Sequence, residues 1–159
     1  MKTVYIETSI LGYLRNRPSS QIINAARQLL TRKWWNEERH NFETVVSQYV
    51  IDEAADGDKH LAEDRLAMIE GVPVLPHDPL IVELAQKIMA FGILPTKAEV
   101  DALHISTVAV HQIDYLLTWN CKHIANARIL PKIHNLLIEQ GIPIPIICTP
   151  EEFVGDETR

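Results

Sequence analysis

Cysteine is scarce in this sequence, and hydrophobic runs long enough to span a membrane are absent. The 159 residues include two cysteines, Cys121 and Cys148, which are too few for a disulfide framework. No apolar run reaches the roughly 20 residues that a transmembrane helix needs. The N-terminus has no signal-peptide pattern, because Met1-Lys2 leads straight into a short apolar stretch. These absences predict a reduced, cytoplasmic protein without membrane contact.

Phosphate-binding and zinc-binding signatures are also missing. The sequence contains neither a glycine-rich phosphate loop nor a dinucleotide fingerprint, which argues against two common α/β enzyme classes. Seven histidines are present, but no Cys/His spacing supports a zinc site. Cys121 has no triad-like partners in sequence order, so we expect it to be a packing residue rather than a nucleophile.

Charge is distributed unevenly along the chain. The formal net charge is −6, which argues against general nucleic-acid binding over the whole surface. Residues 1–39 carry seven Lys or Arg against three Glu (+4), whereas residues 40–101 carry four Lys or Arg against twelve Asp or Glu (−8). Two interpretations stay open: solvated helix faces, or an edge that contacts a polyanion beside an acidic pocket.

Short apolar segments alternate with segments of helical periodicity, which predicts a mostly parallel sheet covered by helices on both faces. The fold class expected is therefore α/β, as a three-layer α/β/α domain around a five-stranded sheet. We expect one domain over residues 1–154, followed by a flexible tail at 155–159. The expected strands are 4–7, 42–47, 72–75, 113–118 and 144–148. The expected helices are 10–14, 21–39, one beginning at 48, 58–70, 78–91, 97–111, 124–127 and 131–140.

Four polar residues are expected at one edge of this sheet. Glu7 ends the first strand and Asn120 follows the fourth. Glu53 and Asp101 lie in the first turns of helices that return antiparallel to the strands, so their N-terminal ends sit at the carboxyl edge. Open α/β folds bind their ligands there. Thr8 or Ser9 is expected to cap the first helix.

Three clustered carboxylates repel one another unless a cation neutralises them. An all-oxygen site suits Mg²⁺ or Mn²⁺. Such a metal can activate a water for attack on a phosphodiester, and no side-chain nucleophile is then required. The interpretation from the residues alone is a metal-dependent hydrolase with Glu7, Glu53 and Asp101 as metal ligands.

Several motifs resemble a known family. Tyr5-Ile6-Glu7-Thr8-Ser9, the helix around Glu53, Asp101-Ala102-Leu103-His104-Ile105 and the 115–124 segment resemble a PIN domain, and specifically the VapC-like toxins of type II toxin–antitoxin systems. The resemblance covers nearly the whole chain. It implies a metal-dependent ribonuclease with a five-stranded parallel sheet. Glu7, Glu53 and Asp101 would be its acids, and Asn120 stands where many members have a fourth.

The resemblance also implies partners and supporting residues. A cognate antitoxin is expected to insert a segment into the cleft or along the helix that contains Trp34 and Trp35. One of these rings is expected in the core, and the other is either partly buried in the monomer or covers a partner surface. A homodimer is expected. Hydroxyl or imidazole groups near the site are Thr8, Ser9, Thr118 and His104. His123 is expected to contact the site or to cap a helix. RNA phosphates would be held by Arg15, Arg17, Lys122 or Arg128.

Two departures from the family pattern leave an alternative open. The first acid is usually Asp, whereas Glu7 is one methylene longer, and Asn120 is neutral. A PIN-like module that binds RNA or protein without useful turnover is therefore the second hypothesis. A metal-dependent phosphatase for small esters is a third.

Overall fold

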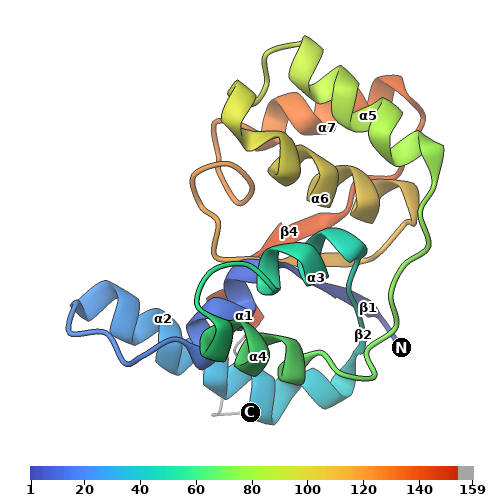
Figure 1. The fold of residues 1–159 in the computed structure, drawn as a ribbon. Helices are drawn as coiled ribbons and strands as arrows, with labels where there is room; N and C mark the ends of the chain where they lie inside the picture. The colour runs from blue at the N-terminus through green and yellow to red at the C-terminus, as the bar shows by residue number, and fades with distance from the viewer. Residues whose placement is uncertain (154–159) are drawn as a thin grey trace, which may run out of the picture.

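The structure is a computed structural model that describes residues 1–153. Its centre is a parallel four-stranded sheet with the order β2-β1-β3-β4 (Figure 1). The strands are β1 (Thr3–Ile6), β2 (Glu43–Val45), β3 (Tyr115–Leu117) and β4 (Ile146–Cys148). In the register, Val4 of the central strand lies opposite Thr44 on one side and Tyr115 on the other. The predicted α/β class and parallel sheet are confirmed.

The prediction of a fifth strand at residues 72–75 is wrong. Only one bridge forms there, between Val46 and Val74. It rests on hydrogen bonds from Val46 N to Pro73 O (3.0 Å) and from Leu75 N to Val46 O (2.8 Å). Pro73 has no N–H to donate, so this short segment cannot extend a regular ladder.

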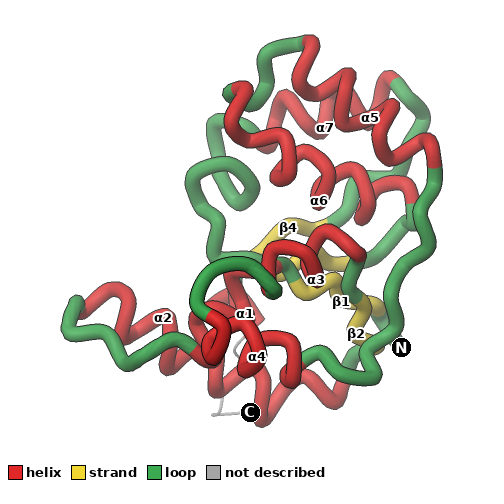
Figure 2. Tube along the Cα trace, in the orientation of Figure 1, coloured by secondary structure: helices red, strands yellow, loops and turns green. Residues whose placement is uncertain are grey.

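Seven α-helices in the described residues flank the sheet (Figure 2). Figure 1 shows α5, α6 and α7 on one side, with α1, α2 and α4 on the other. Three begin at or next to the residues where the sequence predicts a helix start, and there Ser47, Asp58 and Asp78 each accept a first-turn backbone N–H. The bounds are α1 (Thr8–Arg15), α2 (Ile22–Lys33), α3 (Gln48–Ala54), α4 (Lys59–Met68), α5 (Pro79–Ala90), α6 (Glu99–Val110) and α7 (Leu130–Glu139).

The long helix predicted over 21–39 changes its winding. After α2 the chain continues as a π-helical turn (Trp34–Glu38) and a 3₁₀ turn (Arg39–Asn41). Both tryptophans are buried, and Trp34 stacks on Phe42 with ring centroids 6.3 Å apart. The prediction that one of the two covers a partner surface is therefore wrong, because the wider turn directs both rings into the core.

Two smaller expectations also fail. Residues 124–127 form no helix, because the Asn126 side chain donates to the carbonyls of Cys121 (2.9 Å) and Lys122 (3.3 Å) and so stabilises a non-helical turn. The helix expected from residue 97 begins at Glu99 instead, after a 3₁₀ turn at Thr96–Ala98.

The core surrounds the central strand. Val4, Tyr5 and Ile6 of β1 are fully buried. Glu7 follows them directly, so it lies at the carboxyl edge of the sheet. Among the described helices, none is long and apolar enough to cross a membrane. The tail expected at 155–159, and residue 154 before it, lie outside the described residues.

Candidate active site

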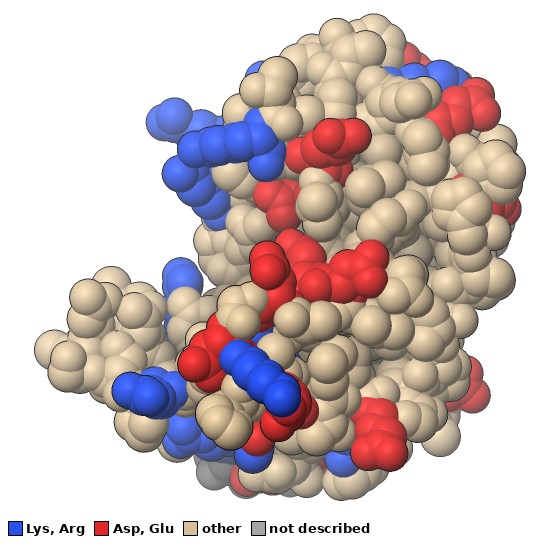
Figure 3. All heavy atoms as spheres, in the orientation of Figure 1, with Lys and Arg blue, Asp and Glu red and all other residues tan. Residues whose placement is uncertain are grey.

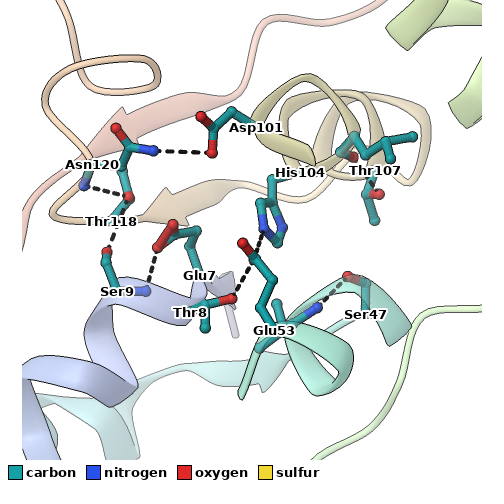
Figure 4. Close-up of polar contacts among 12 residues, drawn as sticks. Glu7, Thr8, Ser9, Ser47, Glu53, Asp101, His104, Thr107, Thr118 and Asn120 are labelled. Carbon is teal, nitrogen blue, oxygen red and sulfur yellow. Dashed lines mark hydrogen bonds and ion pairs between the residues drawn. The ribbon is translucent and has the colours of Figure 1, made fainter. Parts of the chain in front are cut away.

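Acidic side chains gather over α3 and toward α6 on the face that Figure 3 shows. Beneath them, the carboxylates of Glu7, Glu53 and Asp101 come from three elements and face the space between them (Figure 4). His104 lies close enough to interact electrostatically with all three. The carboxyl edge of the sheet thus assembles these residues as the sequence predicts.

Glu7 itself caps α1. Its Oε2 accepts a 2.6 Å hydrogen bond from the Ser9 backbone N–H. The expectation that Thr8 or Ser9 caps this helix is therefore wrong, because the longer glutamate side chain folds back onto the helix N-terminus and occupies that position. A negative group at a helix N-terminus is stabilised by the helix dipole.

Glu7 is buried, with 4% of its surface exposed. Burial raises the pKa of its carboxyl group above the usual value, although nearby His104 and the bonds from Ser9 act in the opposite direction. A buried carboxylate whose charged form is disfavoured by burial is a group that a cation could stabilise.

Glu53 is held by two donors. Thr8 Oγ1 donates to its Oε1 (2.7 Å), and His104 Nε2 lies 2.5 Å from the same oxygen. Behind the imidazole, Nδ1 is 2.7 Å from the Tyr5 hydroxyl, which is also 2.6 Å from Ser47 Oγ. We call the four residues Ser47, Tyr5, His104 and Glu53 the polar chain. It runs from a buried helix cap to the edge of the sheet.

The pKa values of Glu53 and His104 are shifted in opposite directions. Burial alone would raise the pKa of Glu53, but the hydrogen bond and charge of His104 and the bond from Thr8 lower it. Burial alone would lower the pKa of His104, but the hydrogen bond to Glu53 and the negative charges of Glu7 and Asp101 raise it. Both shifts favour a carboxylate–imidazolium pair inside the protein.

Asp101 is fixed on the other side of the site. Asn120 Nδ2 donates to its Oδ1 (3.0 Å), and His123 Nδ1 lies 3.1 Å from its Oδ2. Asn120 Oδ1 in turn accepts the His123 backbone N–H at 3.0 Å. Asn120 therefore positions Asp101 and shapes the turn after β3, and His123 both contacts the site and completes that turn.

Hydroxyl groups join α1 to the end of β3. Ser9 Oγ accepts the Trp119 backbone N–H (2.8 Å) and lies 3.4 Å from Thr118 Oγ1, which accepts the Asn120 backbone N–H (2.9 Å). Thr118 and Ser9 thus fix the distance between Glu7 and Asn120. Of the three expected hydroxyl residues, Thr8 bonds the Glu53 carboxylate and Ser9 bonds that of Glu7.

The donor chemistry suits Mg²⁺ or Mn²⁺, because Glu7, Glu53 and Asp101 all present oxygens. In the described part of the chain, however, no three His, Cys, Asp or Glu groups come together closely enough to hold a metal ion. Glu53 and Asp101 are bonded to His104 and His123, so a metal held by all three carboxylates requires both side chains to move closer to Glu7.

The basic residues expected to hold RNA are outside this cluster. Lys122 and Arg128 are exposed on the segment after β3, and Arg17 is exposed in the loop after α1. Arg15 pairs with Asp64 on α4 at 3.8 Å. In Figure 3, Lys and Arg side chains lie mainly along one margin of the face that carries the acidic cluster.

Sequence reasoning missed the role of Tyr5. The residue was interpreted as part of a buried strand, and it is one, but its hydroxyl contacts two polar side chains from distant segments. A buried tyrosine usually finds a partner for its hydroxyl. That rule was the available signal, although it does not identify the partner.

We expect Tyr5→Phe to lower the free energy of unfolding by about 1–3 kcal/mol, because it leaves Ser47 and His104 with unsatisfied buried atoms. Urea unfolding measures this change. The matched control is Tyr115→Phe on β3, whose hydroxyl has no partner among the described residues. Equal effects of the two substitutions would contradict a stabilising role for the polar chain.

Comparison with known proteins identifies a related fold. The structure is similar to a chain in the crystal structure of VapBC2 from Rickettsia felis bound to a DNA fragment from their promoter. The TM-score is 0.52 at 16% sequence identity, over 92% of this chain and 98% of that chain. No family model and no curated protein matches the sequence. At this identity the likeness is evidence for the fold alone.

Proposed function

We propose that this protein is a Mg²⁺- or Mn²⁺-dependent endoribonuclease of the PIN type, and the toxin of a type II toxin–antitoxin pair. One observation carries the proposal: Glu7, Glu53 and Asp101 face one space at the carboxyl edge of the sheet. The fold shared with a chain of the VapBC2 complex supports it. The sequence motifs that resemble VapC-like toxins contain the same three residues.

Each residue has a defined part in the proposed reaction. Glu7, Glu53 and Asp101 would hold the metal, which supplies a water activated for attack on an RNA phosphodiester. Thr8 and His104 hold the Glu53 side chain close to the site before substrate binds. Asn120 positions Asp101. The longer Glu7 side chain reaches the site while its second oxygen caps α1.

Partners follow from the same proposal. The similar structure contains a VapBC2 complex with promoter DNA. For this chain we propose a cognate antitoxin that covers the acidic edge, a homodimer, and an RNA substrate whose phosphates contact Arg15, Arg17, Lys122 or Arg128. Because Trp34 and Trp35 are buried, an antitoxin would contact the outer face of α2 instead of these rings.

A second candidate function has an observation of its own. The Glu53 and Asp101 carboxylates are each engaged by histidine and another polar group, and within the described residues no three-ligand cluster exists. This arrangement suits a PIN-like module that binds RNA or protein without cutting it. The two functions differ in whether a metal draws the carboxylates together.

We expect purified protein to cleave structured RNAs when Mn²⁺ or Mg²⁺ is present and to stop when EDTA removes the metal. Gel analysis of RNA fragments measures this dependence. Cleavage that persists in EDTA would contradict the metal mechanism, and RNA binding without cleavage in Mn²⁺ would favour the binding module. Hydrolysis of p-nitrophenyl phosphate with intact RNA would instead indicate a phosphatase.

A further inference from the structure

A groove opens beside the acidic edge, between α1, the 16–21 loop and α2. Its volume is about 360 Å³, within the range of small-molecule sites. Ser9 lines the groove, and it also bonds Glu7 through its backbone N–H and Trp119, just after β3, through its hydroxyl. The lining residues are Ser9, Gly12, Tyr13, Asn16, Arg17, Ser19, Asn24 and Gln28.

The groove is held open by a buried amide. Gln28 is 5% exposed, and its Oε1 accepts the Ser19 backbone N–H (3.0 Å) while its Nε2 donates to the Arg17 carbonyl (2.9 Å). Both ends of this side chain therefore fix the loop that forms one wall. A wall fixed by buried hydrogen bonds is pre-formed for a ligand, which reduces the entropy lost on binding.

Gly12 forms part of the groove in the middle of α1. Glycine destabilises a helix interior relative to alanine, so its presence there needs a reason. A Cβ added to Gly12 would meet only the end of the Asn16 side chain, at 3.4 Å. The missing side chain leaves the space of the groove free, and the first atom of a larger residue would meet no backbone of another element.

The chemistry of the groove contrasts with that of the acidic edge. No carboxylate of the described residues lines it, whereas its lining includes amide and hydroxyl residues together with Arg17. Arg27 lies outside the lining but reaches one of its residues, because its Nη1 donates to the Tyr13 hydroxyl (3.3 Å). Amide groups both donate and accept hydrogen bonds. Together with a nearby cation, they suit a ligand in which an anion is joined to a polar heterocycle.

We propose that this groove binds one nucleotide of the single-stranded RNA substrate, next to the phosphodiester that is cut. The inference rests on the proposed ribonuclease function and adds a site that selects substrate. Arg17 contacts the phosphate, and Asn16, Ser19 and Asn24 contact the edge of the base. Since Ser9 adjoins both places, a strand bound in the groove continues directly to Glu7.

Titration with the four ribonucleoside 5′-monophosphates, without added metal, tests the site separately from cleavage. Amide chemical shifts in NMR spectra of the full chain are the measurement. We expect shifts at Gly12, Asn16 and Ser19, with one base preferred. Gly12→Leu should weaken binding at least tenfold because it fills the groove. Ala26→Leu, which adds the same side chain at an exposed position on α2, should leave it unchanged.

A second pair of variants does not depend on the helix. Arg17→Ala in the exposed loop should weaken nucleotide binding at least threefold, and Arg32→Ala on α2 should have no effect. The proposal is overturned if no monophosphate shifts the groove amides. Inorganic phosphate that gives the same shifts and affinity as the nucleotides would also overturn it, since the site would then recognise an anion only.

The two proposals fail in different ways. If a nucleotide binds in the groove but no RNA is cut in Mn²⁺, the ribonuclease proposal fails and the nucleotide site remains. If RNA is cut but Gly12→Leu changes neither cleavage rate nor the base at the cut, the groove proposal fails alone.

Discussion

Asp101→Asn should reduce Mn²⁺-dependent RNA cleavage by at least about 100-fold with little loss of stability. Asparagine keeps an oxygen that can accept from Asn120 Nδ2, so the local hydrogen bond survives. The substitution removes one of three negative charges that would hold the metal, and carboxylates are the ligands on which such sites depend. Initial rates on a single RNA, together with thermal unfolding of both proteins, measure the two effects.

Glu99→Gln is the matched control for this substitution. Glu99 lies two residues earlier, also in the first turn of α6, and its side chain is exposed. Loss of its charge alters the same helix terminus without reaching the acidic edge, so cleavage should remain near the wild-type rate. Equal rates for wild type and Asp101→Asn would rule out Asp101 as a metal ligand.

The sequence predicts the composition of the acidic edge because topology determines it. Glu7 follows the central parallel strand and Asp101 lies in the first turn of α6, so topology alone puts both at the carboxyl edge. Glu53 is the sixth of the seven residues of α3, so its place at this edge depends on how that short helix packs. Helix starts depend on residues that are neighbours in the sequence. The helices expected from residues 48, 58 and 78 therefore begin close to where the structure has them, with Ser47, Asp58 and Asp78 as caps.

The contacts within the site could not be predicted, because they depend on side-chain rotamers. No neighbouring residue in the sequence indicates that His104 contacts Glu53 through one ring nitrogen and Tyr5 through the other, since these partners are 51 and 99 residues away. The same holds for His123 and Asp101. The missing fifth strand has a different origin: Pro73 favours a place at the sheet edge, but its effect on the length of the strand pairing depends on how close Val46 lies.

Replacing Glu7 with glutamine should stabilise the fold while abolishing cleavage. The wild-type carboxylate is buried, whereas a neutral amide keeps an acceptor for the Ser9 N–H and avoids a buried charge. In metal-free buffer at pH 8 we expect Glu7→Gln to raise the free energy of unfolding by about 1–3 kcal/mol. Urea denaturation measures it. Exposed Glu43→Gln on β2 is the control and should change little.

The stability difference between wild type and Glu7→Gln depends on pH. Because burial raises the pKa of Glu7 above 4.5, its contribution to stability is present below that pH and is lost as the pH rises through the folded-state value. The stability gained by Glu7→Gln should therefore be small near pH 4 and grow toward pH 8. Mn²⁺ should then raise the melting temperature of the wild type, because a metal that binds only the folded protein stabilises it. The melting temperature of Glu7→Gln should stay unchanged, because this variant lacks the carboxylate that would bind the metal. A variant no more stable than wild type at pH 8 would mean that existing groups already neutralise Glu7, and the case for a metal at this edge would fail with it.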